Sequence, residues 1–300
     1  KQKTAYEISL GLVGSEMCIR DRYITLNIQN PNDGSCYDKC ILWRYIYEHY
    51  GGINIIRNIF EQIRSDHPGG MFGYDFDEEI ETISRVLPRD FDECFINFTR
   101  ANYLEFSPHP FARDDEFYQH SNCYYENVFT WDIVLDCRTT FPYTFTGVVG
   151  RYAASYLNIT SEIAIGEINI TFDGDDSTDF NVKLILISNS DIVETTIPLN
   201  ANQRGSYTAS NLGKDIDNII VIITRNSTRG DEYVNYQVLI NVTAIENGLR
   251  YLRCQQNPDG SWTYSGRVTE ENVGLTAMAT AAFLNHGIDE NDPTVRKAID

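Results

Sequence analysis

The sequence predicts a multidomain α + β protein with a helical subdomain, an antiparallel β-sandwich and a second helical segment, in that order. From about residue 36 to 105, apolar residues recur at spacings of three and four, as they do in amphipathic helices. From about residue 143 to 243 the period changes to two, in short β-branched runs between polar turns, which is typical of a β-sandwich. The helical period returns at residue 244. A length of 300 residues agrees with two or three domains.

Four helices are expected in residues 23–105, which we define as the helical subdomain. The runs CYDKCILWRYIYEHYGG and INIIRNIFEQIRSD each place apolar residues on one helical face, and the Gly pair ends the first helix. DFDEEIETISRVL and DFDECFINFTRANYLE each open with Asp followed three residues later by Glu. Such pairs match a capping box, in which two side chains satisfy free N–H groups of the first turn: Asp75 with Glu78 and Asp90 with Glu93. Residues 106–142 are expected to be an irregular linker.

The β-sandwich is expected over residues 143–243. Five short runs rich in β-branched residues are the expected strands: GEINITF, NVKLILI, DIVETTIPL, NIIVIITR and YVNYQVLINV. The polar stretches DGDDSTD, NANQRGS and NSTRGDE separate these runs and have the composition of turns.

The composition is acidic, with 43 Asp and Glu against 24 Lys and Arg and a formal net charge of −19. This balance argues against nucleic acid or an anionic membrane as a partner, because phosphates are bound by clustered basic residues. No apolar run approaches the 18 residues of a membrane span. Five sequons permit N-glycosylation in an exported protein: Asn97, Asn158, Asn169, Asn226 and Asn241. We expect an extracellular or cell-surface glycoprotein. The sequence does not identify its partner, for which a protein or a cell-surface ligand is the candidate.

The seven cysteines include no CxxC pair, so zinc-ribbon and thioredoxin-like sites lose their main support. Cys123 and Cys137 lie in the expected linker, where they could form a disulfide that ties down a long loop. Together with His120 they could instead bind a metal. Cys36 and Cys40 are one helical turn apart and are expected to be small buried thiols.

GLRYLRCQQNPDGSW resembles the QW-type repeat of the α/α toroids found in squalene and hopene cyclases and in protein prenyltransferases. The matching residues are Gly248, Tyr251, Leu252, Gln256, Gly260 and Trp262, while Asn247 stands where the repeat prefers a basic residue. The resemblance implies that residues 244–300 are one repeat of a truncated toroid that continues beyond residue 300, since one repeat cannot bury its apolar face alone. In this family the motif is structural and supplies no chemistry by itself.

The turn Asp173-Gly174-Asp175-Asp176 has two further interpretations. It spells DxDD, the protonating motif of class II terpenoid cyclases, but it lies between two expected strands rather than inside a toroid. It also contains Asp173, Asp175 and Asp179, whose alternation suits oxygen ligands of calcium. The glycine and the bidentate Glu of a complete calcium loop are missing, so a plain acidic hairpin turn is the alternative.

Residues 23–243 resemble the helical C-terminal part and following β-sandwich of a group of secreted proteins classed as zinc metallopeptidases. ILWRYIYEHYGGINIIRNIFEQIR and DFDECFINFTRANYL carry this resemblance. In that family an HExxH helix precedes this region, and no HExxH occurs here. The five histidines are scattered: His49, His67, His109, His120 and His286. The resemblance therefore implies zinc only in sequence upstream, and it assigns no catalytic residue and no cofactor to this chain.

Three functions remain open. The chain could be part of a secreted modular protein in which these modules have structural or binding roles, which we favour. The parent could be an active zinc metallopeptidase whose HExxH lies upstream. The parent could also be a terpenoid cyclase or prenyltransferase-like enzyme, which zinc ligands or a DxDD inside later repeats would indicate.

Residues 1–22, KQKTAYEISLGLVGSEMCIRDR, are similar to the translation of a common short-read sequencing adapter. The resemblance implies that this stretch is non-native and that the native sequence begins near Tyr23, within a gene. We expect residues 1–22 to pack on nothing specific.

Overall fold

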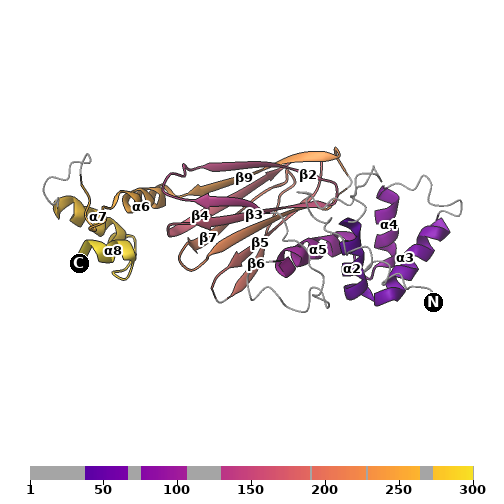
Figure 1. Cartoon of the computed structure of the whole chain (residues 1–300). Coiled ribbons are helices and arrows are strands. Elements are labelled where there is room, and N and C mark those ends of the chain that lie inside the picture. Colours follow the sequence, from indigo (N-terminus) through magenta and orange to yellow (C-terminus); the bar gives the residue numbers. More distant parts are fainter. Residues whose placement is uncertain are drawn as a thin grey trace.

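The computed structural model describes residues 38–66, 76–106, 130–189, 191–227, 229–263 and 273–299. Figure 1 shows the β-sandwich in the middle of an elongated molecule, with the helical subdomain at one end and the last three helices at the other. None of the helices among the described residues combines the length and the apolar character that a membrane span requires. The adapter-like residues 1–22 lie outside the described residues.

The four helices expected from the sequence are present: α2 (Asp38–Tyr50), α3 (Gly52–Asp66), α4 (Phe76–Val86) and α5 (Phe91–Phe106). Helix α3 buries one face through Ile55, Ile59 and Ile63, at spacings of four that bring the side chains onto a single stripe. At the start of α5 the Asp90 carboxylate accepts a hydrogen bond from the Asp92 N–H (3.3 Å), and Glu93 pairs with Arg89 rather than completing the predicted capping box. The other predicted box includes Asp75, which lies outside the described residues.

The described strands form two sheets, in the orders β1-β3-β8-β5-β6 and β2-β9-β4-β7. Every strand pair is antiparallel except β1 with β3. The strands are β1 (Trp131–Leu135), β2 (Tyr143–Gly150), β3 (Ala153–Ser161), β4 (Ile165–Gly174), β5 (Phe180–Ile187), β6 (Ile192–Ile197), β7 (Arg204–Leu212), β8 (Asn218–Arg225) and β9 (Tyr233–Val242). Thus the mixed α + β class is confirmed. The prediction of an irregular linker through residue 142 is wrong for β1, a five-residue edge strand too short to show a period of two.

The two faces of β8 explain its continuous apolar sequence. Residues 219–223 are all almost fully buried, whereas β9 alternates buried and exposed positions. One face of β8 lies in the core between the sheets, and the other contributes Ile220 and Ile222 to a cluster that includes Tyr103 and Leu104 of α5. Helix α5 therefore covers the outer face of the five-stranded sheet, and a strand buried on both sides has no polar alternation to show.

The C-terminal helices are α6 (Ala244–Gln255), α7 (Val273–Asn285) and α8 (Pro293–Ile299), which we call the C-terminal repeat. Only Thr243 separates β9 from α6. Its hydroxyl accepts a hydrogen bond from the Glu246 N–H (3.1 Å), so this residue ends the strand and caps the helix. The three helices share a small core of their own around Trp262 and Phe283.

Candidate functional site

The acidic turn between β4 and β5 does not bring the three candidate calcium ligands onto a common point. Asp173 pairs with Arg204 (2.7 Å), Asp179 pairs with Arg229 (3.4 Å), and the Asp175 carboxylate accepts the Ser177 N–H (2.8 Å). Among the described residues, no group of three His, Cys, Asp or Glu side chains is placed to hold a metal ion. Calcium at this turn stays a prediction that gains no support from the arrangement.

The same turn lacks the property that an alkene-protonating acid needs. Hydrogen bonds from the Ser177 side chain and backbone N–H hold the pKa of Asp175 below its usual value. A protonating carboxyl must have a raised pKa so that it carries its proton at neutral pH. The environment lowers the pKa of Asp175 instead of raising it, which argues against the cyclase interpretation of DGDD.

A buried arginine beside this turn was not singled out from the sequence. Arg225, at the end of β8, is fully buried and donates four hydrogen bonds: to the Thr178 hydroxyl (3.0 Å) and to the carbonyls of Arg229 (2.6 Å), Asp231 (2.6 Å) and Glu232 (3.1 Å). The acceptors come from the two connections that cross between the sheets, β4–β5 and β8–β9. The register partner of Arg225 on β3 is Ala153, the first residue after the β2–β3 turn. Arg225 therefore stabilises the end of the sandwich that carries this turn.

The contact between the helical subdomain and the sandwich is part of a core. Tyr152, in the turn between β2 and β3, is 5% exposed and packs among the phenylalanines of α5. Its hydroxyl donates to the Asp92 carboxylate (2.6 Å). The Thr99 and Thr224 hydroxyls are 3.1 Å apart, and Arg100 forms a two-point pair with Glu194 of β6. This combination of apolar burial and paired polar groups fixes α5 on the sheet.

Burial raises the pKa of the Asp92 carboxyl above its usual value, and the Asp90 charge adds to the shift. An acid whose pKa is higher in the folded state contributes most stability when protonated, below its unfolded pKa of about 3.9. That contribution is lost as pH rises through the folded pKa. We therefore expect Asp92→Asn to gain in unfolding free energy relative to wild type as pH rises from 3 to 7. Urea denaturation of both proteins at pH 3, 5 and 7 measures this difference, and a constant or falling difference would contradict it.

Cys94 of α5 is a free cysteine, but it is not a candidate nucleophile. It is fully buried in the helical subdomain, and this burial raises the pKa of its thiol to about 12. Because the thiolate is the reactive form, Cys94 is inert at neutral pH.

Four residues of the QW-type motif meet inside the C-terminal repeat. The Trp262 indole N–H donates to the Leu252 carbonyl (2.7 Å), and the Gln256 amide donates to the carbonyls of Gly260 (3.0 Å) and Thr294 (2.8 Å). Gly260 has φ of +88°, and a Cβ there would lie 1.8 Å from the Lys297 carbonyl oxygen. The motif thus joins the end of α6 to the following turn and to α8.

The other two motif residues face away from this core. Tyr251 is 63% exposed, and a Cβ added at Gly248 would meet nothing within 4 Å. Large exposed apolar side chains occur on all three helices of the repeat: Ile245, Tyr251, Val273, Met278, Leu284 and Ile299. An apolar surface spread over so small a unit is typical of a module that packs against neighbours.

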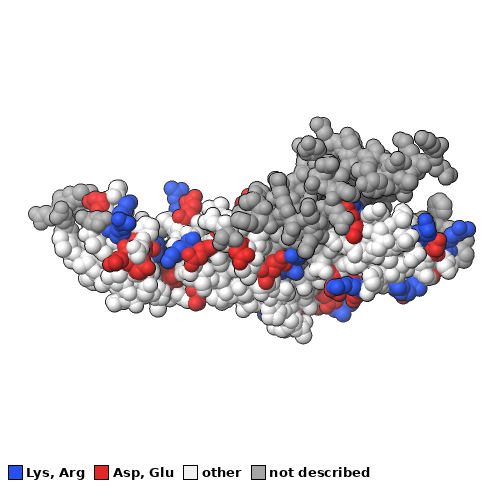
Figure 2. Space-filling model, turned by 90° about the horizontal axis from the view of Figure 1, so that it is seen from below, with Lys and Arg blue, Asp and Glu red and all other residues white. Residues whose placement is uncertain are grey.

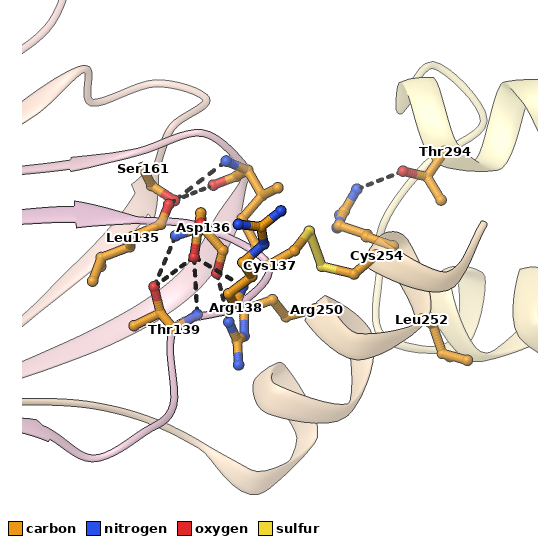
Figure 3. The surroundings of a disulfide bond; sticks show 12 residues. Leu135, Asp136, Cys137, Arg138, Thr139, Ser161, Arg250, Leu252, Cys254 and Thr294 are labelled. Carbon is orange, nitrogen blue, oxygen red and sulfur yellow. Dashed lines mark hydrogen bonds between the residues drawn. A yellow bond between two sulfur atoms is a disulfide. The ribbon is translucent and has the colours of Figure 1, made fainter. Parts of the chain in front are cut away.

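A disulfide joins the sandwich to the C-terminal repeat. Cys137, in the turn after β1, is bonded to Cys254 near the end of α6, across 117 residues of sequence (Figure 3). The predicted Cys123–Cys137 alternative is therefore wrong, as is a metal site that uses the Cys137 thiolate. The spacing of 14 residues favoured a local loop, whereas the fold brings the β1–β2 turn beside a helix more than a hundred residues away.

The turn that carries Cys137 is locally ordered. The Asp136 carboxylate accepts the N–H groups of Arg138 (2.8 Å) and Thr139 (2.9 Å), the geometry of an Asx turn. Arg250, one helical turn before Cys254, donates to the Asp136 carbonyl (2.8 Å) and lies 4.8 Å from the centre of the Phe141 ring. These contacts place α6 against the end of the sandwich, as Figure 3 shows.

The charged surface fits the composition. On the face seen in Figure 2, Lys and Arg are interspersed with Asp and Glu along the length of the molecule. A phosphate-binding surface requires a cluster of basic side chains, and this face has none among the described residues.

Comparison with models of known protein families finds no match, and comparison with curated proteins finds none either. Among solved structures, the pre-peptidase C-terminal domain of collagenase from Bacillus anthracis is 14% identical with a TM-score of 0.28, over 38% of this chain and 95% of that one. The Yersinia pseudotuberculosis-derived mitogen is 16% identical with a TM-score of 0.26, over 35% and 89%. Salmonella Typhimurium PliG, a periplasmic lysozyme inhibitor of g-type lysozyme, is 13% identical with a TM-score of 0.24, over 37% and 98%. No conclusion about fold, family or function follows from similarities of this extent.

Proposed function

We propose that the described part of the chain is a structural and binding module of an extracellular modular protein. Its role is to hold the helical subdomain and the C-terminal repeat at fixed positions on opposite ends of a rigid sandwich. The observation that carries this proposal is the continuity of buried or covalent contacts along the molecule. Tyr152 and α5 join one end to the sandwich, and Cys137–Cys254 with Arg250 joins the other.

The extracellular location is supported by the disulfide. Disulfides persist in oxidising compartments and are rare in reducing ones. Cys137 is solvent-exposed, so a reducing cytosol would have direct access to the bond.

The C-terminal repeat is proposed to be one unit of an α/α toroid. In support, Leu252, Gln256, Gly260 and Trp262 of the motif are linked by hydrogen bonds, and exposed apolar side chains occur on all three helices. Repeats of this kind bury such surfaces against adjacent repeats, so the natural partner of this surface is another helical pair of the same kind. The ligand of the whole assembly is proposed to be a protein or a cell-surface group.

Cooperative unfolding tests whether the helical subdomain and the sandwich are one unit. Tyr152→Ala removes the buried ring at their contact, and truncations of large aromatic side chains in cores cost about 3 to 5 kcal/mol. We expect calorimetry to show one transition for these two parts in the wild type and two transitions in Tyr152→Ala.

The control is Tyr152→Phe, which keeps the ring and loses the hydrogen bond to Asp92, at a cost of about 1 to 2 kcal/mol. It should keep the single transition. Two separate transitions in the wild type would contradict the proposal that the parts form a rigid module.

A further inference from the structure

The two ends of the sandwich are attached to their helical units by different kinds of contact. At the helical subdomain the joint is a shared core, because Tyr152 belongs to the helical cluster and α5 covers the sheet. At the C-terminal repeat no core is shared: the cluster around Trp262 contains no residue of the sandwich. The contacts described on that side are the disulfide, the hydrogen bond from Arg250 to the Asp136 carbonyl and the stacking of Arg250 on the Phe141 ring.

Helix α6 has two faces that make different contacts. Glu246, Arg250 and Cys254 follow at intervals of four, so they lie on one face. This face lies against the sandwich, where Arg250 reaches the β1–β2 turn and Cys254 is bonded to it. The Glu246 carboxylate lies between the two parts: a Cβ on Gly166 of β4 would be 2.8 Å from it, and His286 of the repeat is 4.0 Å away.

The second face of α6 turns to the repeat. Leu249 belongs to the repeat core, and Arg253 pairs with the buried Asp292 (2.9 Å) and the Thr294 hydroxyl (3.1 Å). Arg253 and Cys254 are neighbours in sequence, yet one binds α8 and its preceding turn and the other binds the sandwich. The end of α6 therefore couples the orientation of α8 to that of the sandwich (Figure 3).

Covalent bonds hold α6 at both ends. Its N-terminus continues directly from β9 through the single residue Thr243, and its C-terminal turn is bonded to Cys137. A helix of 12 residues is about 18 Å long. With both ends attached, it cannot rotate about Thr243; with the disulfide open, the peptide at Thr243 is the one covalent attachment left between these parts.

We propose that the Cys137–Cys254 disulfide is a redox-sensitive lock on the orientation of the C-terminal repeat relative to the sandwich. This inference rests on the proposed function as a rigid module, and it identifies the disulfide as the bond that controls the rigidity of that module. In the oxidised chain the repeat is held in one orientation. Reduction frees it to pivot at Thr243 while each part keeps its own core.

The reaction requires an external dithiol. One of its thiolates attacks a sulfur of the disulfide and breaks the S–S bond, and its second thiolate displaces the protein from the mixed disulfide. The dithiol loses two electrons and two protons and closes to a disulfide, while Cys137 and Cys254 become two thiols. Cys137 is exposed, so the bond is accessible to such a reagent.

Residual dipolar couplings of backbone amides test the lock in the full chain, because they report the relative orientation of two parts directly. In the oxidised wild type, one alignment tensor should fit the sandwich strands and α6–α8. In Cys137→Ser/Cys254→Ser, and in wild type treated with dithiothreitol, the alignment magnitude of α6–α8 should fall about twofold or more against the sandwich. Unchanged chemical shifts of the backbone amides within each core would show that both parts stay folded.

Oxidised Arg250→Ala is the matched control, since it loses the polar contact and keeps the disulfide; it should retain the single tensor. A double-serine variant that also retains the single tensor would overturn the lock and leave the rigid module intact. Failure of dithiothreitol to lower the alignment magnitude would overturn the redox sensitivity. Separate tensors in the oxidised wild type would instead refute the rigid module, so the two failures are distinguishable.

Discussion

Replacing Arg225 by alanine should lower the free energy of unfolding by about 3 kcal/mol, because hydrogen bonds to a charged group contribute about 1.5 to 3 kcal/mol each and several are lost together. The guanidinium is fully buried and donates to four acceptors. Without it the carbonyls of Arg229, Asp231 and Glu232 lose the donor that holds the β8–β9 connection in place. Urea denaturation followed by circular dichroism measures the loss.

Arg225→Lys is the control that separates charge from geometry. Lysine keeps the positive charge, but its single ammonium cannot reach acceptors on two separate loops as the planar guanidinium does. We expect Arg225→Lys to lower the free energy of unfolding by less than Arg225→Ala does, but by more than about 0.5 kcal/mol. If both variants matched wild type within about 0.5 kcal/mol, as most surface substitutions do, the assigned role of Arg225 would be wrong.

Replacing Gly260 by alanine should destabilise the C-terminal repeat by about 3 kcal/mol or more, through a backbone clash and a left-handed conformation. The new Cβ would lie 1.8 Å from the Lys297 carbonyl oxygen, and backbone cannot move aside as a flexible side chain can. We expect amide hydrogen exchange to rise throughout α6, α7 and α8 while β4, β8 and β9 keep their protection.

Gly248→Ala is the same type of substitution in the same motif, but we expect it to raise the stability of the repeat instead of lowering it. Gly248 is inside α6, and nothing lies within 4 Å of its missing side chain. Alanine there should stabilise the helix by about 0.5 to 1 kcal/mol, since glycine loses more backbone freedom on folding. A Gly260→Ala variant with wild-type exchange in α8 would contradict the packing described for the motif.

Most of the fold was predictable because local periodicity determines it. The four N-terminal helices follow from spacings of three to four, and β4, β5, β6, β8 and β9 lie at the five β-branched runs predicted as strands. Strand β7 (Arg204–Leu212) was not predicted, and its first three residues were assigned to a turn. Strand β1 was not predictable, since an edge strand of five residues between aromatics has no clear period. At the start of α5, the Asp90 carboxylate accepts a backbone N–H as predicted, whereas Glu93 pairs with Arg89, whose opposite charge the capping-box prediction did not consider.

The site was less predictable, because it depends on contacts between distant segments. Within the motif, the Trp262 indole donates to the Leu252 carbonyl and the Gln256 amide to the Gly260 carbonyl, contacts that span about ten residues of chain. The bond between Cys137 and Cys254 spans 117 residues, and no local pattern encodes it. In the sequence, Arg225 looks like any polar residue at the end of a strand. Its role depends on the β4–β5 and β8–β9 connections, which supply its hydrogen-bond acceptors only in the folded chain.

Backbone ¹⁵N relaxation of the oxidised chain tests the central claim, that the helical subdomain, the sandwich and the C-terminal repeat form one rigid body. Amides in α3, α5, β4, β8, β9, α6 and α7 should fit a single, axially elongated rotational diffusion tensor. Correlation times for α3 or α7 that are clearly shorter than those of β8 and β9 would show independent tumbling and would contradict the claim.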